Sequence, residues 1–157
     1  MSVTDANSLD AVVRLAIQNV ADGGGPFAAL IVRGDEIVAE GVNRVTRDLD
    51  PTAHAEVVAM RNACQAVGDF NLAGCVLVSS CEPCPLCLAA ALWARVDAIV
   101  YAADRHDAAR GGFDDLAFYD LFDTPRDQWA LPVEQEAVPS ASAPFDAWLA
   151  KTDRVDY

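Results

Sequence analysis

Positive charge is scarce in this sequence, which has 11 Lys and Arg residues against 24 Asp and Glu and a formal net charge of −13. Because nucleic-acid binding depends on basic surfaces, this balance argues against a DNA or RNA substrate and leaves small neutral ligands open. The sequence also lacks an apolar run of the roughly 18 residues that a membrane-spanning helix needs. Residues 1–10 lack the basic stretch of a secretory signal. We therefore expect a cytoplasmic protein with neither a membrane nor a nucleic acid among its partners.

Histidine is also scarce, with 2 residues, and the 5 cysteines are unevenly spread. An odd number of cysteines in a reducing compartment does not suggest a disulfide framework. Cys81, Cys84 and Cys87 fall together in the segment 81–87. In a cytoplasmic protein, such clustering indicates metal or redox chemistry. Cys64 and Cys75 instead have the apolar neighbours of core or strand residues.

The length of 157 residues predicts a single domain over residues 1–157. Apolar periodicity and helix-forming composition predict helices over residues 5–20, 52–67, 85–95, 116–122 and 144–151. Strands are predicted over residues 27–32, 36–43, 75–79, 98–102 and 131–138, the first two as a hairpin. Loops are predicted at 46–51 and 110–115, and a tail at 153–157. Strands that alternate with helices indicate an α/β fold, in which helices cover both faces of one sheet.

Two short motifs carry the chemistry: His54-Ala55-Glu56 and Pro83-Cys84-Pro85-Leu86-Cys87. Their order and spacing are the pattern of zinc-dependent nucleobase deaminases. His54, Cys84 and Cys87 would bind one zinc ion per chain and leave its fourth position open for water. Glu56 would not bind the metal but would move protons beside it. The sequence therefore predicts a zinc cofactor and a hydrolytic reaction.

Helix geometry supports half of this site and sets a condition on the other half. Cys84 and Cys87 are three residues apart at the start of a predicted helix, which places both sulfurs on one side. The positive end of the helix dipole favours the thiolate form that binds zinc. His54 and Glu56 are two residues apart and would diverge on the body of a helix. Both can serve one site only if that site lies beyond the helix end.

Other uses of these cysteines stay open at this point. A lone Cys-x-x-Cys is more often redox-active, structural or incidental than catalytic. The spacing of Cys81, Cys84 and Cys87 is also compatible with an iron–sulfur cluster, although no fourth cysteine follows at a suitable distance. A closed structural zinc site would need a fourth ligand, for which Cys81 is the candidate. In the catalytic interpretation, Cys81 is a supporting or packing residue.

Over nearly its whole length the sequence resembles the cytidine-deaminase superfamily and, within it, the bacterial guanine deaminases. The zinc motifs are specific to the superfamily only. The Phe-Asp-Asp loop at 113–115 and the terminal tyrosine point to the guanine deaminases. The motifs that agree are Gly25-Pro26-Phe27, Gly41-Val42-Asn43, Asp50-Pro51-Thr52-Ala53-His54-Ala55-Glu56, Ser80-Cys81-Glu82-Pro83-Cys84-Pro85-Leu86-Cys87, Trp93-Ala94-Arg95, Gly112-Phe113-Asp114-Asp115, Pro144-Phe145-x-x-Trp148 and Tyr157.

The resemblance implies a three-layer α/β/α fold with a mixed central sheet of about five strands. It implies a homodimer in which the C-terminal segment 144–157 is exchanged and closes the partner's active site. It also implies deamination of guanine to xanthine and ammonia, in purine salvage or catabolism. The partner molecule would then be a purine base or a related amino-heterocycle.

The resemblance further assigns roles around the zinc site. It implies that Asn43 and Ala55 contact the base and that Phe27 stacks on it or lines the pocket. It implies that Asp115 contacts the amino group and shuttles protons, and that Tyr157 caps the pocket. Simpler explanations exist for four of these residues: a turn residue (Asn43), a core residue (Phe27), a loop acid or helix cap (Asp115) and a disordered terminus (Tyr157).

Several functions therefore compete. The first is guanine deamination. The second keeps the zinc chemistry but acts on guanosine, cytidine, cytosine or an aminotriazine such as ammeline. The third is a noncatalytic zinc domain, which would require Cys81 or another residue as a fourth ligand. His106, the other histidine, lies in a polar segment and is not expected to take part in catalysis.

Overall fold

The structure, a computed structural model, describes residues 6–157. Asp5, which opens the predicted helix 5–20, lies outside the described residues. The chain forms two compact units, of which the first ends at Tyr119 and the second comprises Asp120–Tyr157. The single domain over residues 1–157 stays a prediction. None of the described helices combines the length and the apolar character needed to cross a membrane.

The first unit is built around a mixed sheet with the strand order β2-β1-β3-β4. Its strands are β1 (Ala28–Arg33), β2 (Glu36–Val42), β3 (Val76–Cys81) and β4 (Ala98–Ala103). β1 pairs antiparallel with both β2 and β3, whereas β3 pairs in parallel with β4. The predicted hairpin is confirmed, and Gly34 at its turn has a φ of 59°, a conformation that glycine adopts without strain.

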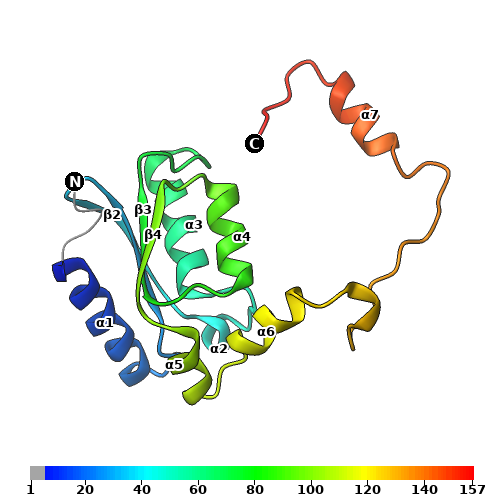
Figure 1. Ribbon diagram of the computed structural model, residues 1–157. Helices are drawn as coiled ribbons and strands as arrows, with labels where there is room; N and C mark the ends of the chain where they lie inside the picture. The colour runs from blue at the N-terminus through cyan, green and yellow to red at the C-terminus, as the bar shows by residue number, and fades with distance from the viewer. Residues whose placement is uncertain (1–5) are drawn as a thin grey trace. The chain divides into compact units, whose positions relative to one another are not determined.

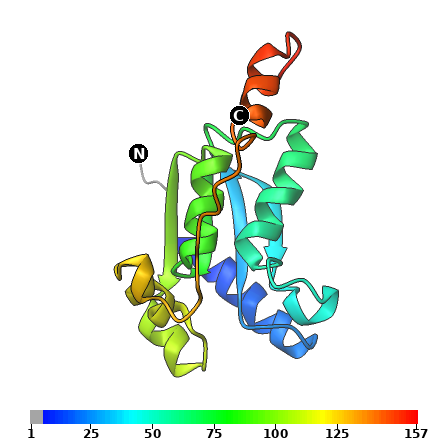
Figure 2. The same ribbon diagram turned by 90° about the vertical axis from the view of Figure 1, so that its right-hand side faces the viewer.

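Helices cover both faces of this sheet, as Figures 1 and 2 show. Helix α1 (Ala6–Ala21) packs on one face, and α3 (Ala55–Val67) and α4 (Pro85–Ala94) pack on the other. Alternate residues of β1 serve the two cores, because successive side chains of a strand point to opposite faces. Leu30 packs with α1, whereas Ile31 packs with α3 and α4. The three-layer α/β/α fold is therefore confirmed.

The start of α3 is held unusually close to β2. A Cβ atom on Gly41 would lie 2.3 Å from the Ala55 carbonyl oxygen and 2.3 Å from the Ala59 nitrogen. Only glycine allows the two backbones to approach in this way. The contact fixes the first turn of α3 against the sheet, and His54 and Glu56 lie at this end of the helix.

Two short helices of the first unit were not predicted. Helix α2 (Val45–Asp48) occupies part of the expected loop 46–51, where Arg44 and Asp48 form an ion pair of 2.7 Å across one helical turn. Helix α5 (Arg105–Arg110) begins after Asp104, whose side chain accepts hydrogen bonds from two backbone N–H groups of the first turn. Asp104 and Asp107 form a capping box without the usual Ser/Thr and Glu/Gln.

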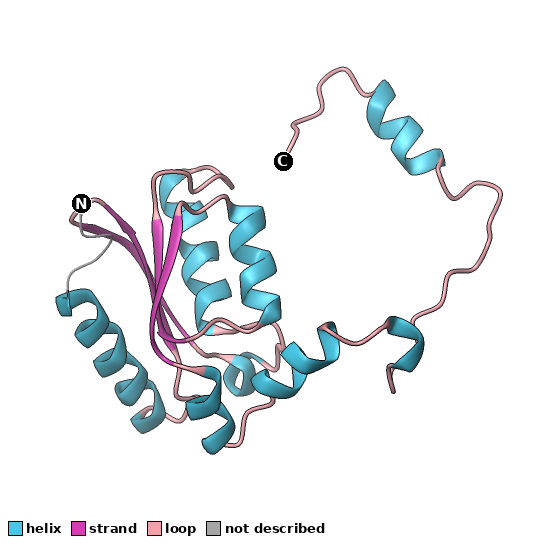
Figure 3. Cartoon of the chain, viewed as in Figure 1, coloured by secondary structure: helices cyan, strands magenta, loops and turns pink. Residues whose placement is uncertain are grey.

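Helix α6 (Asp115–Phe122) crosses the boundary between the units and confirms the helix predicted at 116–122. The second unit continues with the 3₁₀ helix η1 (Arg126–Gln128) and with α7 (Ala143–Ala150), close to the predicted 144–151. Residues 131–138, predicted as a strand, are loop (Figure 3). Pro132 has no N–H to donate to a ladder. The sheet thus has four strands among the described residues, instead of about five.

Candidate zinc and base-binding site

A cavity of about 400 Å³ opens in the first unit where α3 and α4 begin. Each helix is preceded by an N-cap residue with extended backbone, His54 for α3 and Cys84 for α4. Helix N-termini leave backbone N–H groups free and favour negative charge, which suits thiolates. The cavity is lined by Gly23, Gly24, Gly25, Phe27, Asn43, Val45, Thr46, Pro51, His54, Ala55, Glu56, Glu82, Cys84, Phe113 and Asp115.

His54 and Glu56 can serve one site only if it lies beyond the helix end, and the structure meets this condition. Helix α3 begins later than predicted, at Ala55 instead of residue 52. His54 is the N-cap, with φ −65° and ψ 151°, so it lies outside the helix. Glu56 lies in the first helical turn. The break between extended and helical backbone is what lets two side chains separated by one residue serve one site.

Three metal donors converge at this point. The His54 Nδ1 atom lies 3.5 Å from the Cys84 Sγ and 3.5 Å from the Cys87 Sγ, and the two sulfurs are 3.7 Å apart. A tetrahedral zinc ion with ordinary Zn–S and Zn–N bonds separates two sulfurs by about 3.8 Å and a sulfur from a nitrogen by about 3.6 Å. The donor set therefore fits one zinc ion, and these residues are placed to bind it.

The electrostatics of the two thiols favour metal binding. A hydrogen bond between the two thiols, followed by the one to His54, lowers the pKa of Cys84 to about 4. The same hydrogen bond, together with burial, raises the pKa of Cys87. Hydrogen bonding to Cys84 also raises the pKa of His54. The cluster thus carries one thiolate easily, and a divalent cation would compensate the charge of the second.

Cys81 does not belong to this donor set. Its thiol donates a hydrogen bond of 3.6 Å to the Asp104 carbonyl, and burial raises its pKa to about 12. A neutral thiol engaged elsewhere is a poor zinc ligand. Among the described residues, the metal-donor cluster comprises His54, Cys84 and Cys87 without a fourth protein ligand. The arrangement is that of a catalytic zinc site with an open position, not that of a closed structural one.

Glu56 lies beside the donors and is 5% exposed. Its Oε2 atom accepts a hydrogen bond of 3.4 Å from the Cys87 thiol, and its Oε1 atom accepts one of 3.1 Å from the Ser79 hydroxyl. Burial raises the pKa of Glu56, which makes the carboxylate a better proton acceptor. Ser79 is buried in β3 and orients Glu56, a contact that the sequence motifs do not reveal.

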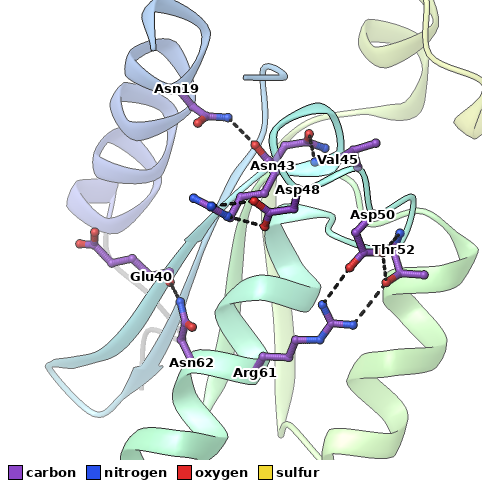
Figure 4. Close-up of polar contacts among 10 residues, drawn as sticks. Asn19, Glu40, Asn43, Val45, Asp48, Asp50, Thr52, Arg61 and Asn62 are labelled. Atoms are coloured by element: carbon purple, nitrogen blue, oxygen red, sulfur yellow. Dashed lines mark hydrogen bonds and ion pairs between the residues drawn. The ribbon is translucent and has the colours of Figure 1, made fainter. Parts of the chain in front are cut away.

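One wall of the cavity combines an amide with two aromatic rings. Asn43 is 9% exposed, and its Oδ1 accepts a hydrogen bond from the Val45 N–H at 3.3 Å (Figure 4). Phe27 and Phe113 meet edge to face with their centroids 4.7 Å apart. Ala55 also lines the cavity. Phe113 belongs to the Phe-Asp-Asp loop, but the sequence predicts no role for it in the pocket.

Asp115 lies on the rim of the same cavity, at the start of α6. It is half-buried, and burial, followed by the negative charge of Cys84, raises its pKa. A carboxylate whose pKa is raised in this way is a better proton acceptor than an exposed aspartate. The structure thus brings Asp115 to the same cavity as the predicted zinc ligands and Glu56.

A second group of residues, absent from our sequence-based assignments, supports the loop that carries Cys84. Arg105 forms a two-point ion pair with Glu82, with distances of 2.6 and 3.1 Å, and this lowers the pKa of Glu82. The Arg105 guanidinium also lies 3.5 Å above the centre of the Tyr119 ring. The Tyr119 hydroxyl donates a hydrogen bond to the Pro83 carbonyl. These contacts fix the segment just before Cys84.

Two predicted assignments concern residues elsewhere. Tyr157 lies in the second unit, where its ring meets the edge of Trp148 at a centroid distance of 6.3 Å. Its role as a cap stays a prediction. His106 is exposed in the first turn of α5 and does not line the cavity.

Comparisons with known proteins agree with this geometry. Residues 3–103 match the family described as the cytidine and deoxycytidylate deaminase zinc-binding region. The chain is 46% identical to the guanine deaminase of Bacillus subtilis over 95% of its own length and 96% of that protein. The X-ray structure of guanine deaminase from Bacillus subtilis superposes with a TM-score of 0.94, at 44% identity, over 98% of this chain and 99% of that chain.

Two further relatives are less similar to this chain. A solved protein in complex with 2,6-diaminopurine is 36% identical and has a TM-score of 0.66, over 69% of this chain and 61% of that chain. The tRNA-specific adenosine deaminase of Aquifex aeolicus is 32% identical over 74% of this chain and 75% of that protein.

Proposed function

Because the chain belongs to the cytidine and deoxycytidylate deaminase zinc-binding family, we propose that it hydrolyses guanine to xanthine and ammonia. It is an aminohydrolase of cyclic amidines with a zinc cofactor. The observation that carries the choice of guanine is the similarity to a guanine deaminase over 95% of the chain. The cavity supports it, since buried Glu56 adjoins the zinc donors while Asn43 and two phenylalanine rings form a wall suited to a flat base.

The proposed reaction assigns roles to several residues in and beside the cavity. A zinc ion held by His54, Cys84 and Cys87 would lower the pKa of a bound water molecule to about 7. Glu56 takes one proton from the attacking water and delivers it to a ring nitrogen. It then carries the second proton, from the hydroxyl group now bonded to the carbon, to the leaving amine. A C–O bond forms at the carbon that bears the amino group, the C–N bond breaks, and ammonia leaves. The Ser79 hydroxyl holds the carboxylate of Glu56 in position during these transfers.

The base is held by the groups around it. Asn43 hydrogen-bonds polar atoms on the edge of the purine, and Ala55 contacts the base from the first turn of α3. Phe27 covers one face of the purine ring, and Phe113 packs edge to face with Phe27. Asp115 contacts the exocyclic amino group and accepts or returns a proton as ammonia departs. These groups would fix the amino-bearing carbon beside the open zinc position.

The proposed substrate is a free base, with nucleic acids and membranes excluded as partners. The net charge of −13 supports this choice, because it repels a phosphate backbone. We place the enzyme in the cytoplasm, in purine salvage or catabolism. Five free cysteines, three of them in or beside the zinc site, suit a reducing compartment.

Ammonia release by the zinc-loaded protein tests the substrate directly. Guanine, guanosine, cytidine, ammeline and an adenosine-containing tRNA anticodon stem-loop are offered side by side. We expect kcat/KM for guanine to exceed the others by at least about 100-fold, since a site with dedicated polar contacts can discriminate by about 10⁴-fold or more. Preference for another heterocycle would keep the zinc chemistry and reject guanine. If none of the five compounds released ammonia, a noncatalytic zinc domain would be favoured.

We further propose that the protein is a homodimer in which residues 144–157 close the partner's active site, with Tyr157 as the cap. The second unit carries large apolar side chains that are exposed in the single chain, which is the usual mark of an interaction surface. They include Phe122, Leu131, Val133, Val138, Phe145, Leu149 and Val155. Family resemblance suggests the second copy as their partner.

Complementation between two inactive chains tests the exchange. One chain carries Glu56→Gln and keeps its C-terminal segment, and the other ends at residue 143 but keeps Glu56. Co-expressed, they are expected to form mixed dimers in which one complete site regains turnover, at up to about half the activity per dimer, because only one of two sites is intact. An inactive mixture of stable mixed dimers would show that the segment serves its own chain. A fully active 1–143 chain would show that it is not a lid.

A further inference from the structure

Asn19 links helix α1 to the base-binding wall, although α1 lies on the opposite face of the sheet from the zinc-bearing helices. The residue is 3% exposed. Its side-chain amide nitrogen donates to the Gly25 carbonyl at 2.8 Å and to the Asn43 carbonyl at 3.0 Å. Figure 4 shows the Asn19 side chain directed from α1 toward Asn43. Both N–H groups of the amide are therefore used on segments that line the cavity.

The two acceptor segments are also bonded to each other. The Phe27 N–H donates to the Gly25 carbonyl at 2.9 Å, and the Asn43 N–H donates to the Phe27 carbonyl at 3.0 Å. Asn19 closes this chain of hydrogen bonds by joining its two ends. The Asn19 side chain also packs tightly against Gly24, since a Cβ atom on Gly24 would lie 2.5 Å from the Asn19 amide nitrogen. Asn19, Gly25, Phe27 and Asn43 are thus joined in one hydrogen-bonded network, which forms this wall of the cavity.

We propose that Asn19 is a positioning residue for base recognition. By holding the Gly25 and Asn43 backbones, it keeps the Asn43 amide and the Phe27 ring in their binding positions before the base arrives. The inference rests on the proposed function, because it assigns the base to this wall. Preorganisation of this kind strengthens binding, since the loop need not be ordered when the ligand enters.

The zinc half of the site rests on other contacts. Its donors come from the starts of α3 and α4, and Glu56 is held by Ser79 and Cys87. The segment before His54 is also held by a backbone hydrogen bond of 2.9 Å from the Arg44 N–H to the Ala53 carbonyl, which does not use the Asn19 side chain. Loss of the Asn19 amide should therefore weaken base binding while zinc stays bound.

Steady-state kinetics of Asn19→Ser provide the test. We expect KM for guanine to rise about tenfold or more, with kcat within about threefold of the parent and zinc content unchanged. Asn62→Ser is the control for the same substitution: the Asn62 amide also donates to a backbone carbonyl, that of Glu40 at 2.8 Å, but at an exposed position that joins α3 to β2 outside the cavity lining (Figure 4). It should leave KM unchanged.

Three results would overturn the inference: an unchanged KM in Asn19→Ser, an equal rise in Asn62→Ser, or a fall in kcat and zinc content that matches the rise in KM. Wild-type turnover is measured in the same series, so failure of guanine as a substrate is seen separately.

Hydrogen exchange of the unmodified, zinc-loaded protein covers the case in which Asn19→Ser does not fold. If the wall is preformed, the Phe27 and Asn43 amide protons exchange slowly without ligand, and adding 2,6-diaminopurine slows them by less than about tenfold. Fast exchange in the free protein that becomes protected only on binding would show that the wall is not held in advance and would reject the role of Asn19.

Discussion

Replacement of Glu56 by glutamine is expected to lower kcat for guanine deamination by about 10³-fold or more, since a positioned general acid–base typically contributes 10²- to 10⁴-fold and here acts on two proton transfers. Glutamine keeps the size of the side chain and can still receive a hydrogen bond from the Ser79 hydroxyl. It cannot accept a proton. The measurement is kcat by ammonia release, with zinc per chain determined on the same sample.

Glu36→Gln is the control for the change in charge, because Glu36 is an exposed residue at the start of β2. It should retain full turnover. Zinc content separates two explanations for a Glu56→Gln loss: about one zinc per chain supports proton transfer by Glu56, whereas loss of zinc would make the carboxylate a structural requirement. A variant with full zinc and more than about a tenth of parental turnover would contradict the assignment.

The sequence predicted the three-layer arrangement and the zinc donors because both depend on short-range patterns. Buried strands and amphipathic helices can be recognised in a sequence from the spacing of their apolar residues. The donors follow a fixed motif, and helix geometry explains why Cys84 and Cys87 face one ion. For His54 and Glu56 the spacing sets only a condition, that the site lie beyond a helix end. The extended backbone of His54 meets this condition.

The secondary-structure predictions were wrong where tertiary contacts or unusual caps determine the local structure. Residues 131–138 have a suitable strand composition, but a strand exists only through backbone pairing, and the described chain offers them no partner. Helix α5 depends on the Asp104 cap and on a capping box made by two aspartates, for which composition gives a weak signal.

Supporting contacts were hidden for a different reason. Ser79 and Arg105 lie far in sequence from the side chains that they hold: Ser79 is 23 positions from Glu56, and Arg105 is 23 positions from Glu82. Asn19 joins segments 6 and 24 residues away. No local pattern marks such pairings. A polar residue on the apolar face of the helix 5–20 would have been the one available signal for Asn19.

Replacement of Cys87 by serine is expected to abolish stable zinc binding and, with it, guanine turnover. Cys87 is fully buried, and its sulfur completes the triangle of donors with His54 and Cys84. A serine hydroxyl remains protonated at neutral pH and is shorter, so two strong donors remain where three are needed. We expect zinc affinity to fall by more than about 100-fold, which is the loss caused by removing an outer-shell partner alone. Equilibrium dialysis against a zinc buffer measures it.

Zinc should also link folding to metal supply, because its donors lie on two separate helix starts. With free zinc at about 100 times Kd, binding stabilises the folded state by about 2.7 kcal/mol, which for a chain of this size corresponds to a shift in Tm of roughly 5–10 °C. A chelator should therefore lower the Tm of the parent and of the control Cys64→Ser, whose thiol lies outside the donor cluster. Cys87→Ser should already have the lower Tm and show no response. If Cys87→Ser instead bound one zinc per chain with a chelator-sensitive Tm, another residue would have to supply the third donor, and the open-site arrangement on which the proposed hydrolysis depends would have to be redrawn.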